Sequence, residues 1–341
     1  MNALVQVGQL DRTTYIGGSD AAAILGVSKW RTPLDVYLIK TGEEQDEISP
    51  EKQKIFRRGK RLEPIAIEML VDEYGFKVTR TSPEEDPNRY QDPEYPFMAA
   101  EIDFEFEVTA ELLDVLPEGF IDPALLGTIQ NGEIKTVHPL AAHMWGEEFT
   151  EDVPIDYAAQ SMHGLMVTGR KVCVYGTLVG ADNLVIYKIE RDEETIAGLR
   201  KKEIAFWQNL TDRLPPDPVN LEDIKTLFAR IRGKAAQIGA ETVQDLLELK
   251  RLRESAKLIE ERKDEVEFRL AMAVRAAWGA SPEAELEDDA RLIHDDLVVG
   301  TWKKQSRATV DGKKLREIAP AAYQECLKES HFRMFRLSKD L

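Results

Sequence analysis

The sequence predicts a mixed α/β fold, a β-sheet covered by helices, with a helical segment and a small β region after it. Short apolar or alternating segments typical of strands are interleaved with longer segments in which apolar residues recur every three or four positions. That order favours a sheet packed between helices. The proline-rich stretch 214–219 then marks a linker.

The length of the chain favours several folded parts. A chain of 341 residues is longer than the chains that usually fold around a single hydrophobic core. We expect a first domain at 1–212, a linker with a short helix at 213–240, a long helix or helical hairpin at 241–280, and a small β region with a basic tail at 281–341.

The elements of the first domain follow from local signals. A helix should begin after Gly17-Gly18, with Ser19 or Asp20 as its cap, and another should end at Gly75. The insertion at 109–127 is acidic and rich in leucine. The expected helices lie at 20–25, from 32 onward, and at 53–74, 155–168 and 192–210; the expected strands lie at 76–79, 97–100, 102–108, 128–137, 171–178 and 184–189.

The segment after the linker has a heptad-like apolar pattern, which Lys263 interrupts. Such spacing on one helix indicates intramolecular packing or an oligomer contact. The apolar positions are Leu249, Leu252, Ala256, Ile259, Val266, Leu270, Ala273 and Ala277.

Charge is strongly negative overall but uneven. The formal net charge of −17 argues against a protein that coats nucleic acid, yet it permits an enzyme that grips a few phosphates. Residues 303–341 contain ten Lys and Arg against five Asp and Glu, a local excess of +5. We expect this tail to assist DNA binding, with local compensation of the acidic body as the alternative.

Several classes are disfavoured by what the sequence contains. The two cysteines are too few for a disulfide framework, a four-cysteine metal cluster or an iron–sulfur nuclease. His138, His143 and His163 form no recognised zinc pattern, and Trp145 and Trp207 are expected in the core. No apolar run has the length of a membrane span or a signal-peptide core, so we expect no membrane association and a place in the bacterial cytoplasm.

Glu133-Ile134-Lys135 is the pattern most suggestive of chemistry. Alternate residues of a strand face the same side, so Glu133 and Lys135 project together while Ile134 points into the core. A carboxylate holds a hard cation, and a neighbouring ammonium steadies charge on an attacked phosphate. Because acid-x-Lys triplets recur elsewhere in the chain, the motif needs its context.

That context is an ordered set of polar residues. Glu63 lies on a predicted helix, Asp103 ends a predicted strand, and Gln160 lies on the helix after Lys135. Together with Gly17-Gly-Ser-Asp-Ala-Ala-Ala-Ile-Leu-Gly, Arg61-Leu-Glu-Pro, Phe97-Met-Ala-Ala-x-x-Asp and Glu133-Ile-Lys-Thr, the set resembles the YqaJ family of phage recombination nucleases over residues 10–212. The lambda exonuclease is related to that family, whose fold is the restriction-endonuclease-like PD-(D/E)xK fold.

The resemblance implies roles for individual residues. Asp103 and Glu133 would bind Mg²⁺, or Mn²⁺ in its place, assisted by the backbone carbonyl of Ile134. Lys135 would position the water, and Glu63 would support a second metal directly or through water. Further, Gln160 would orient the water or the terminal phosphate, and Arg12 and Ser19 would hold a 5′-phosphate.

Several of these residues could instead have purely structural roles. Ser19 is also a helix cap, Arg12 a surface cation, Glu63 an ordinary acid before Pro64, and Gln160 a buried amide. The chain also departs from the family pattern, with Phe104 where glycine usually follows the metal-binding Asp, and with Met162 where a second Gln is common.

The function that the resemblance implies is a 5′-to-3′ exonuclease on duplex DNA ends. It would leave 3′ single strands for a single-strand annealing protein and would work as a homo-oligomer, a trimeric ring. A structure-specific endonuclease or resolvase of the same fold is the nearest alternative. A non-catalytic binding protein or acidic DNA mimic is the alternative from another class, because of the −17 charge.

Overall fold

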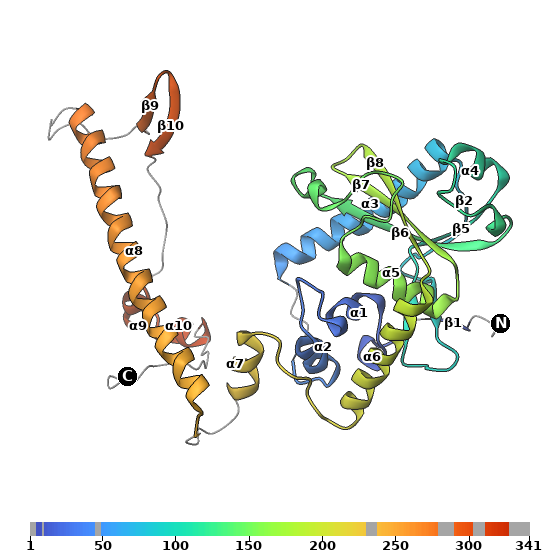
Figure 1. Cartoon of the computed structure of the whole chain (residues 1–341), viewed down its shortest axis with the longest axis horizontal. Coiled ribbons are helices and arrows are strands. Elements are labelled where there is room, and N and C mark those ends of the chain that lie inside the picture. Colours follow the sequence, from blue (N-terminus) through green and yellow to red (C-terminus); the bar gives the residue numbers. More distant parts are fainter. Residues whose placement is uncertain are drawn as a thin grey trace. The chain divides into compact units, whose positions relative to one another are not determined.

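The computed structural model describes residues 5–8, 10–44, 49–229, 237–278, 290–302 and 311–326. Contacts divide the chain into two compact units, 1–224 and 225–341 (Figure 1). The first unit extends past the expected boundary at 212, because the buried Asp223 accepts a 2.9 Å hydrogen bond from Thr32. Within the described ranges, no helix is long and apolar enough to cross a membrane.

The centre of the first unit is a five-stranded sheet of order β2-β5-β6-β7-β8. β6 and β7 run parallel, and the other neighbouring strands run antiparallel. A parallel pair needs a crossover connection, which helix α5 (Ile155–Thr168) supplies. The predicted mixed sheet is thereby confirmed. Its strands are β2 (Lys77–Thr81), β5 (Phe104–Glu107), β6 (Ile129–Val137), β7 (Val172–Val179) and β8 (Asn183–Glu190).

A second sheet has three strands in the order β1-β3-β4. β1 (Val5–Val7), β3 (Arg89–Gln91) and β4 (Ala99–Glu101) are short. Sequence patterning did not predict β1 or β3. The expected strands at 97–100 and 102–108 are shorter in the structure, where β4 and β5 are separated at Ile102 and Asp103.

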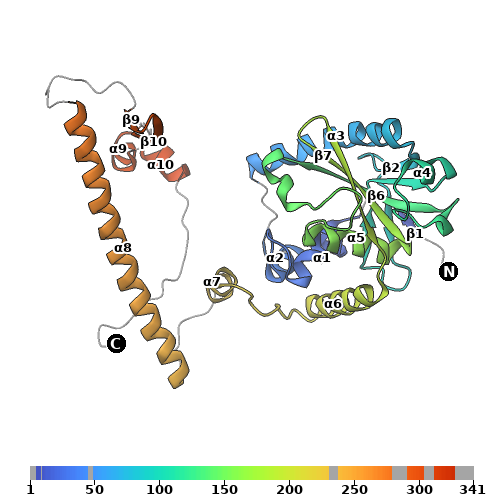
Figure 2. The ribbon, with the colours of Figure 1, turned by 45° about the horizontal axis from the view of Figure 1, so that its top comes forward.

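Helices cover both faces of the large sheet, as predicted, with α3 and α5 on opposite sides (Figure 2). Leu70 of α3 packs with Val174 and Ile186, whereas Leu165 of α5 packs with Tyr175 and Tyr187. Successive side chains along β7 and β8 point to opposite faces of the sheet, so they pack into two separate hydrophobic cores. The helices of this unit are α1 (Gly18–Leu25), α2 (Pro33–Lys40), α3 (Pro50–Tyr74), α4 (Ala110–Val115), α5, α6 (Glu193–Thr211) and the first turn of α7 (Leu221–Ala229), with 3-10 turns η1 (Arg12–Thr14), η2 (Pro123–Leu125) and η3 (Pro139–Met144).

Helix boundaries follow the capping signals. α3 begins at Pro50 because Ser49 accepts a hydrogen bond from the backbone of Lys52, so it starts earlier than the expected residue 53. It ends at Gly75, whose φ of +72° is left-handed, as predicted. The insertion at 109–127 contains α4 and η2 and buries Leu112 and Phe120 against the α3-side core.

The second unit contains one long helix, α8 (Ala240–Trp278), rather than a helical hairpin. β9 (Ala290–His294) and β10 (Leu297–Trp302) pair antiparallel, as the predicted small β region requires. α9 (Gly312–Ile318) and α10 (Pro320–Cys326) follow. The remainder of the expected basic tail, at 303–310 and 327–341, lies outside the described residues.

Candidate active site

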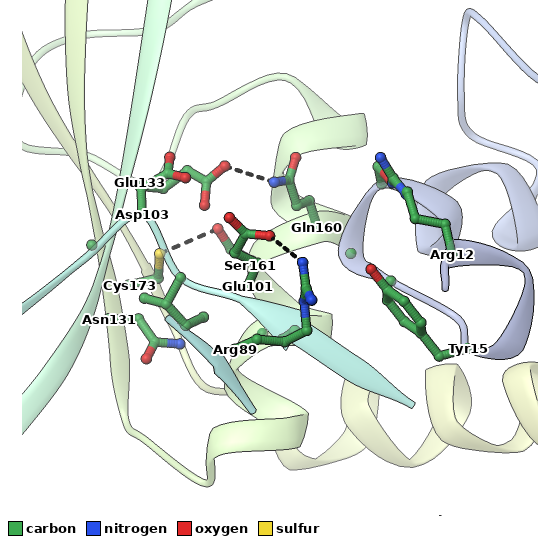
Figure 3. A pocket seen from close by; sticks show the side chains of 17 residues that line it. Arg12, Tyr15, Arg89, Glu101, Asp103, Asn131, Glu133, Gln160, Ser161 and Cys173 are labelled. Carbon is green, nitrogen blue, oxygen red and sulfur yellow. Dashed lines mark hydrogen bonds and ion pairs between the residues drawn. The ribbon is translucent and has the colours of Figure 1, made fainter. Parts of the chain in front are cut away.

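Two neighbouring strands bring Asp103 and Glu133 together. Phe104 of β5 is the register partner of Gly132 of β6, so the residue before Phe104 and the residue after Gly132 lie side by side. Asp103 Oδ2 accepts a 2.9 Å hydrogen bond from the backbone N–H of Ile134. That bond fixes the Asp103 carboxylate beside β6, next to the Glu133 side chain (Figure 3).

Phe104 stands where the family pattern usually has glycine, and Gly132 on the neighbouring strand explains how the ring fits. A Cβ atom at Gly132 would overlap the Phe104 ring, so the glycine of β6 makes room for the aromatic residue of β5. Phe104 is fully buried and packs edge-on against Phe76, with ring centroids 6.4 Å apart. The bulky residue therefore leaves Asp103 in place.

One carboxylate oxygen of Glu133 contacts both the ammonium group of Lys135 and the side-chain amide of Gln160. Lys135 Nζ lies 2.6 Å from Glu133 Oε1, and Gln160 Nε2 donates to the same oxygen at 2.6 Å. Lys135 Nζ also donates to Gln160 Oε1 at 3.3 Å and lies 4.9 Å from the centroid of the Tyr157 ring. The expected common face of Glu133 and Lys135 is thus present, while Ile134 is buried in the α3-side core.

Glu63 reaches the site from α3. Its carboxylate forms a 3.0 Å ion pair with Lys60 one turn earlier. Burial raises the pKa of Glu63, and the negative charge of Asp103 raises it further. Glu63 therefore shares the electrostatic environment of Asp103, and its expected support of a second metal stays a prediction.

The three central side chains perturb one another strongly. Burial raises the pKa of Asp103 and that of Glu133, the latter to about 7, with the charge of Asp103 as a further cause. Burial alone would lower the pKa of Lys135, but the carboxylates of Glu133 and Asp103 outweigh it and raise that pKa. A site that crowds carboxylates in this way favours a bound cation.

The donor chemistry fits a hard divalent cation. Mg²⁺ commonly takes one or two carboxylates and completes its shell with water and substrate phosphate. Across the described ranges, no three His, Cys, Asp or Glu side chains form a ready metal cluster. Asp103 and Glu133 present two adjacent carboxylates; that they bind the metal, with the Ile134 carbonyl assisting, stays a prediction.

Arg12 and Ser19 meet at the start of α1. Arg12 Nη2 donates a 2.7 Å hydrogen bond to Ser19 Oγ. The helix begins after Gly17, whose N–H is bound by Asp20 Oδ2 at 3.0 Å. Ser19 is therefore not the cap, and its hydroxyl lies beside a guanidinium, as the expected phosphate site requires.

One cavity of about 260 Å³ joins this pair to the carboxylates (Figure 3). Gly18 packs closely on α5, where a Cβ would lie 3.0 Å from Gln160 Cγ, and this contact holds the start of α1 against the helix that carries Gln160. The residues that line the cavity include Arg12, Ser19, Arg89, Glu101, Asp103, Glu133, Gln160 and Ser161.

Sequence reasoning missed Arg89 and Glu101 in that cavity. They are register partners in the β3–β4 pair, and Arg89 Nη2 lies 2.8 Å from Glu101 Oε2. Burial would raise the pKa of Glu101, but hydrogen bonds from Ser82 and Arg89 outweigh it and lower that pKa. Arg89 is buried, and its Nε has no hydrogen-bond partner.

A wider groove of about 780 Å³ opens beside Lys135 and Gln160. Arg57 and Lys60 of α3 line it, together with Trp30 and Phe56, whose exposed fractions are 72% and 58%. Basic side chains and exposed rings beside the two carboxylates suit a nucleic acid strand, which presents phosphates and base faces.

The three histidines considered for zinc binding each contact another group in the structure. His163 is fully buried, with Nδ1 2.8 Å from Glu203 and Nε2 3.1 Å from the carbonyl of Ala99. His138 and His143 interact with the backbone of Leu140. Among the aromatic residues, Trp145 is in the core as expected, and Trp207 stacks on Phe97 at 4.9 Å.

Residues 9–171 match the model of the YqaJ-like viral recombinase domain. The chain carries a YqaJ-like recombinase domain. The uncharacterized protein YqaJ of Bacillus subtilis strain 168 is 27% identical over 340 residues, which cover 97% of this chain and 93% of that protein. The YqaJ-type family predicted from the sequence is thereby confirmed.

Two solved structures match part of the chain at low identity. The alkaline exonuclease LHK-Exo of Laribacter hongkongensis is 17% identical, with a TM-score of 0.42, over 60% of this chain and 91% of that one. A phage-related exonuclease from Haemophilus somnus 129PT is 14% identical, with a TM-score of 0.36, over 59% of this chain and 94% of that one.

Proposed function

We propose that this YqaJ-like chain is a Mg²⁺-dependent exonuclease that digests one strand of duplex DNA from its 5′ end. The observation that carries the proposal is the meeting of three side chains: Asp103 and Glu133 as a two-carboxylate metal site, and Lys135 Nζ 2.6 Å from Glu133. Mn²⁺ would substitute for Mg²⁺, because both accept oxygen ligands.

The residues divide the chemistry among them. Asp103 and Glu133 would hold the cation, which when bound lowers the pKa of a water and polarises the scissile phosphate. Lys135, kept protonated by the two carboxylates, would stabilise the charge that develops on that phosphate. Gln160, through its contacts with Glu133 and Lys135, would fix both side chains for the attack.

The proposed direction of digestion, from the 5′ end, is supported by the cavity that Arg12 and Ser19 line. A guanidinium and a hydroxyl, paired at 2.7 Å, offer converging donors to a terminal phosphate. The cavity is small, about 260 Å³, which suits a chain end better than a continuous duplex. Arg89, with its unpartnered Nε, adds a second guanidinium to the same wall.

The wider proposal includes partners. The product would be a 3′ single strand passed to a single-strand annealing protein, and the enzyme would act as a ring-shaped homo-oligomer, a trimer, which keeps it on its substrate. The proposed chemistry of the site requires neither the annealing protein nor the oligomer.

The test is a cleavage assay in Mg²⁺ with three matched duplexes: linear with 5′-phosphate, linear with 5′-hydroxyl, and covalently closed circular. We expect fast digestion of the phosphorylated linear duplex, slower digestion of the hydroxyl end, and an intact circle. For Ser19→Ala we expect about a tenfold smaller preference for the phosphorylated end, because one hydrogen bond to a charged group is lost.

Ser28→Ala is the matched control, since Ser28 lies outside the cavity and lines only the wider groove. Cutting of the circle would identify an endonuclease instead. Absence of cleavage with Mg²⁺ or Mn²⁺, combined with tight binding to a DNA-binding protein, would favour the acidic mimic.

A further inference from the structure

Helix α8 exposes an apolar stripe along most of its 39 residues. Leu252, Ile259 and Leu270 are 59%, 69% and 46% exposed. They belong to the series with alternating spacings of three and four, which keeps one face of a helix apolar. Nothing in the proposed nuclease chemistry uses this stripe.

The spacing assigns heptad positions over four successive repeats. One set, called here the a positions, and a second set, the d positions, form the seam of a coiled coil. The a positions are Leu249, Ala256, Lys263 and Leu270; the d positions are Leu252, Ile259, Val266 and Ala273.

We propose that α8 pairs with α8 of a second copy of this chain in a parallel, in-register coiled coil. The occupant of the stripe is then the same helix of another molecule. The inference is separate from the proposed nuclease activity and from any ring built by the nuclease domain.

Charges beside the seam support the parallel arrangement. In a parallel coiled coil, each residue just before an a position faces the partner residue five positions later in the chain. Glu248 would then face the partner's Arg253, and Arg262 would face the partner's Glu267. Both contacts are attractive, and each occurs twice by symmetry. Ser255 before the intervening a position faces the partner's Glu260 without a charge clash.

The antiparallel arrangement places like charges together. The antiparallel register that superposes the whole apolar stripe pairs Leu249 with the partner's Ala273 and centres the contact near residue 261. Glu260 would then face the partner's Glu260, and Arg262 would face the partner's Arg262. Such contacts between like charges disfavour that direction.

Lys263 fixes the register of the parallel pair. A polar residue at one a position lowers stability but penalises shifted alignments, in which it would face an apolar residue. Here a shift by one heptad sets Lys263 against the partner's Ala256 or Leu270. In register, the two Lys263 side chains meet at the seam, where each forms an ion pair with Glu260 of its own helix. Long side chains of this type extend their charge to the edge of the seam.

Cysteine cross-linking of the full chain tests direction and register together. In a Cys326→Ser background, Ile259→Cys should form a disulfide-linked dimer under mild oxidation, because parallel d positions face each other. Leu258→Cys is the control: it is 64% exposed but points away from the seam. In the antiparallel register, position 259 faces the partner's position 263. A mixture of Ile259→Cys and Lys263→Cys chains would therefore form a mixed disulfide-linked dimer if the helices were antiparallel.

The result that overturns the proposal is no dimer at Ile259→Cys, or equal dimer at Leu258→Cys. A mixed dimer between Ile259→Cys and Lys263→Cys chains in excess of the two matched dimers would also overturn it. This cross-link reports α8 alone, so association through the nuclease domain cannot imitate its register.

A charge swap tests the same contacts by a second route. Arg262→Glu should weaken self-association about tenfold, since two attractive contacts become repulsive. Glu267→Arg added to it should restore the association, as followed by light scattering over a dilution series. Arg251→Glu, which lies off the seam and changes net charge equally, should leave it unchanged. Failure of the double variant to recover would overturn the assigned register.

Discussion

The ring of Phe104 occupies the space above Gly132 where any other residue would carry a Cβ atom. These residues are register partners in the β5–β6 pair, and they immediately adjoin the two carboxylates of the site, Asp103 and Glu133. Their fit therefore sets the alignment of the two strands that carry the proposed metal ligands.

Gly132→Ala should destabilise the fold by about 1–3 kcal/mol, because the added methyl group meets a fully buried ring that cannot move aside. Chemical denaturation followed by circular dichroism measures the change. Phe104→Leu combined with Gly132→Ala should recover part of the loss. The control is Gly198→Ala in α6, where an added Cβ meets nothing within 4 Å; there we expect a gain of about 0.5–1 kcal/mol. An unchanged stability of Gly132→Ala would contradict the packing argument.

This fit shows why some features were predictable and others were not. The Glu133-x-Lys135 face follows from strand periodicity, which is a local property, and the structure has it. The reason for Phe104 lies in a residue of the next strand, which no pattern around position 104 records. Strand pairing created that relation.

The Arg89–Glu101 pair was missed for the same reason. Both residues lie in strands of three residues, too short for a periodic signal, and only their pairing across β3 and β4 brings the side chains together. At the start of α1 the sequence left either Ser19 or Asp20 as the cap. The structure decides between them, because Asp20 accepts a hydrogen bond from the backbone N–H of Gly17, while Ser19 accepts one from Arg12.

Asp103→Asn should strongly reduce cleavage and also change the response of stability to metal. The variant removes one of two adjacent carboxylates, so cleavage should fall about a hundredfold or more if the metal supplies several kcal/mol of transition-state stabilisation. In chelator, Asp103→Asn should unfold at a higher temperature than wild type, because the repulsion between two adjacent carboxylates is removed.

Differential scanning fluorimetry with and without Mg²⁺ separates these effects. Wild type should gain stability on metal addition, since the cation binds only the folded site. Asp103→Asn should gain much less, and Asp86→Asn, an exposed acid paired with Arg80, should behave as wild type. An equal gain in wild type and Asp103→Asn would remove Asp103 from the metal site.

Lys135→Ala should reduce turnover far more than DNA affinity. The ammonium is held against Glu133 at the reacting centre rather than along a binding surface, so its loss should cost about 100- to 1000-fold in turnover at saturation. Single-turnover kinetics and DNA titration in Ca²⁺ measure the two quantities separately. Lys60→Ala in the wider groove is the comparison, with the opposite balance expected. A loss of affinity with unchanged turnover would make Lys135 only a phosphate contact.

The buried pair of His163 and Glu203 should make stability depend on pH in a defined direction. Burial alone would lower the pKa of His163, but the charge of Glu203 and the hydrogen bonds that the ring donates to the Glu203 carboxylate and the Ala99 carbonyl outweigh it and raise that pKa. A histidine with a raised pKa in the folded state adds stability that is complete below its unfolded pKa, about 6.5. That contribution is lost as pH rises through the folded pKa.

The expected measurement is therefore a difference between two chains. Wild type should be more stable than His163→Gln near pH 6, and the difference should shrink steadily as the pH rises above about 6.5. Carboxylates of the metal site titrate in both chains and cancel in the subtraction. His143→Gln, an exposed histidine, serves as control and should give a difference that is small at every pH. A difference between wild type and His163→Gln that grows with pH would mean that His163 is neutral in the folded chain, and it would contradict the prediction.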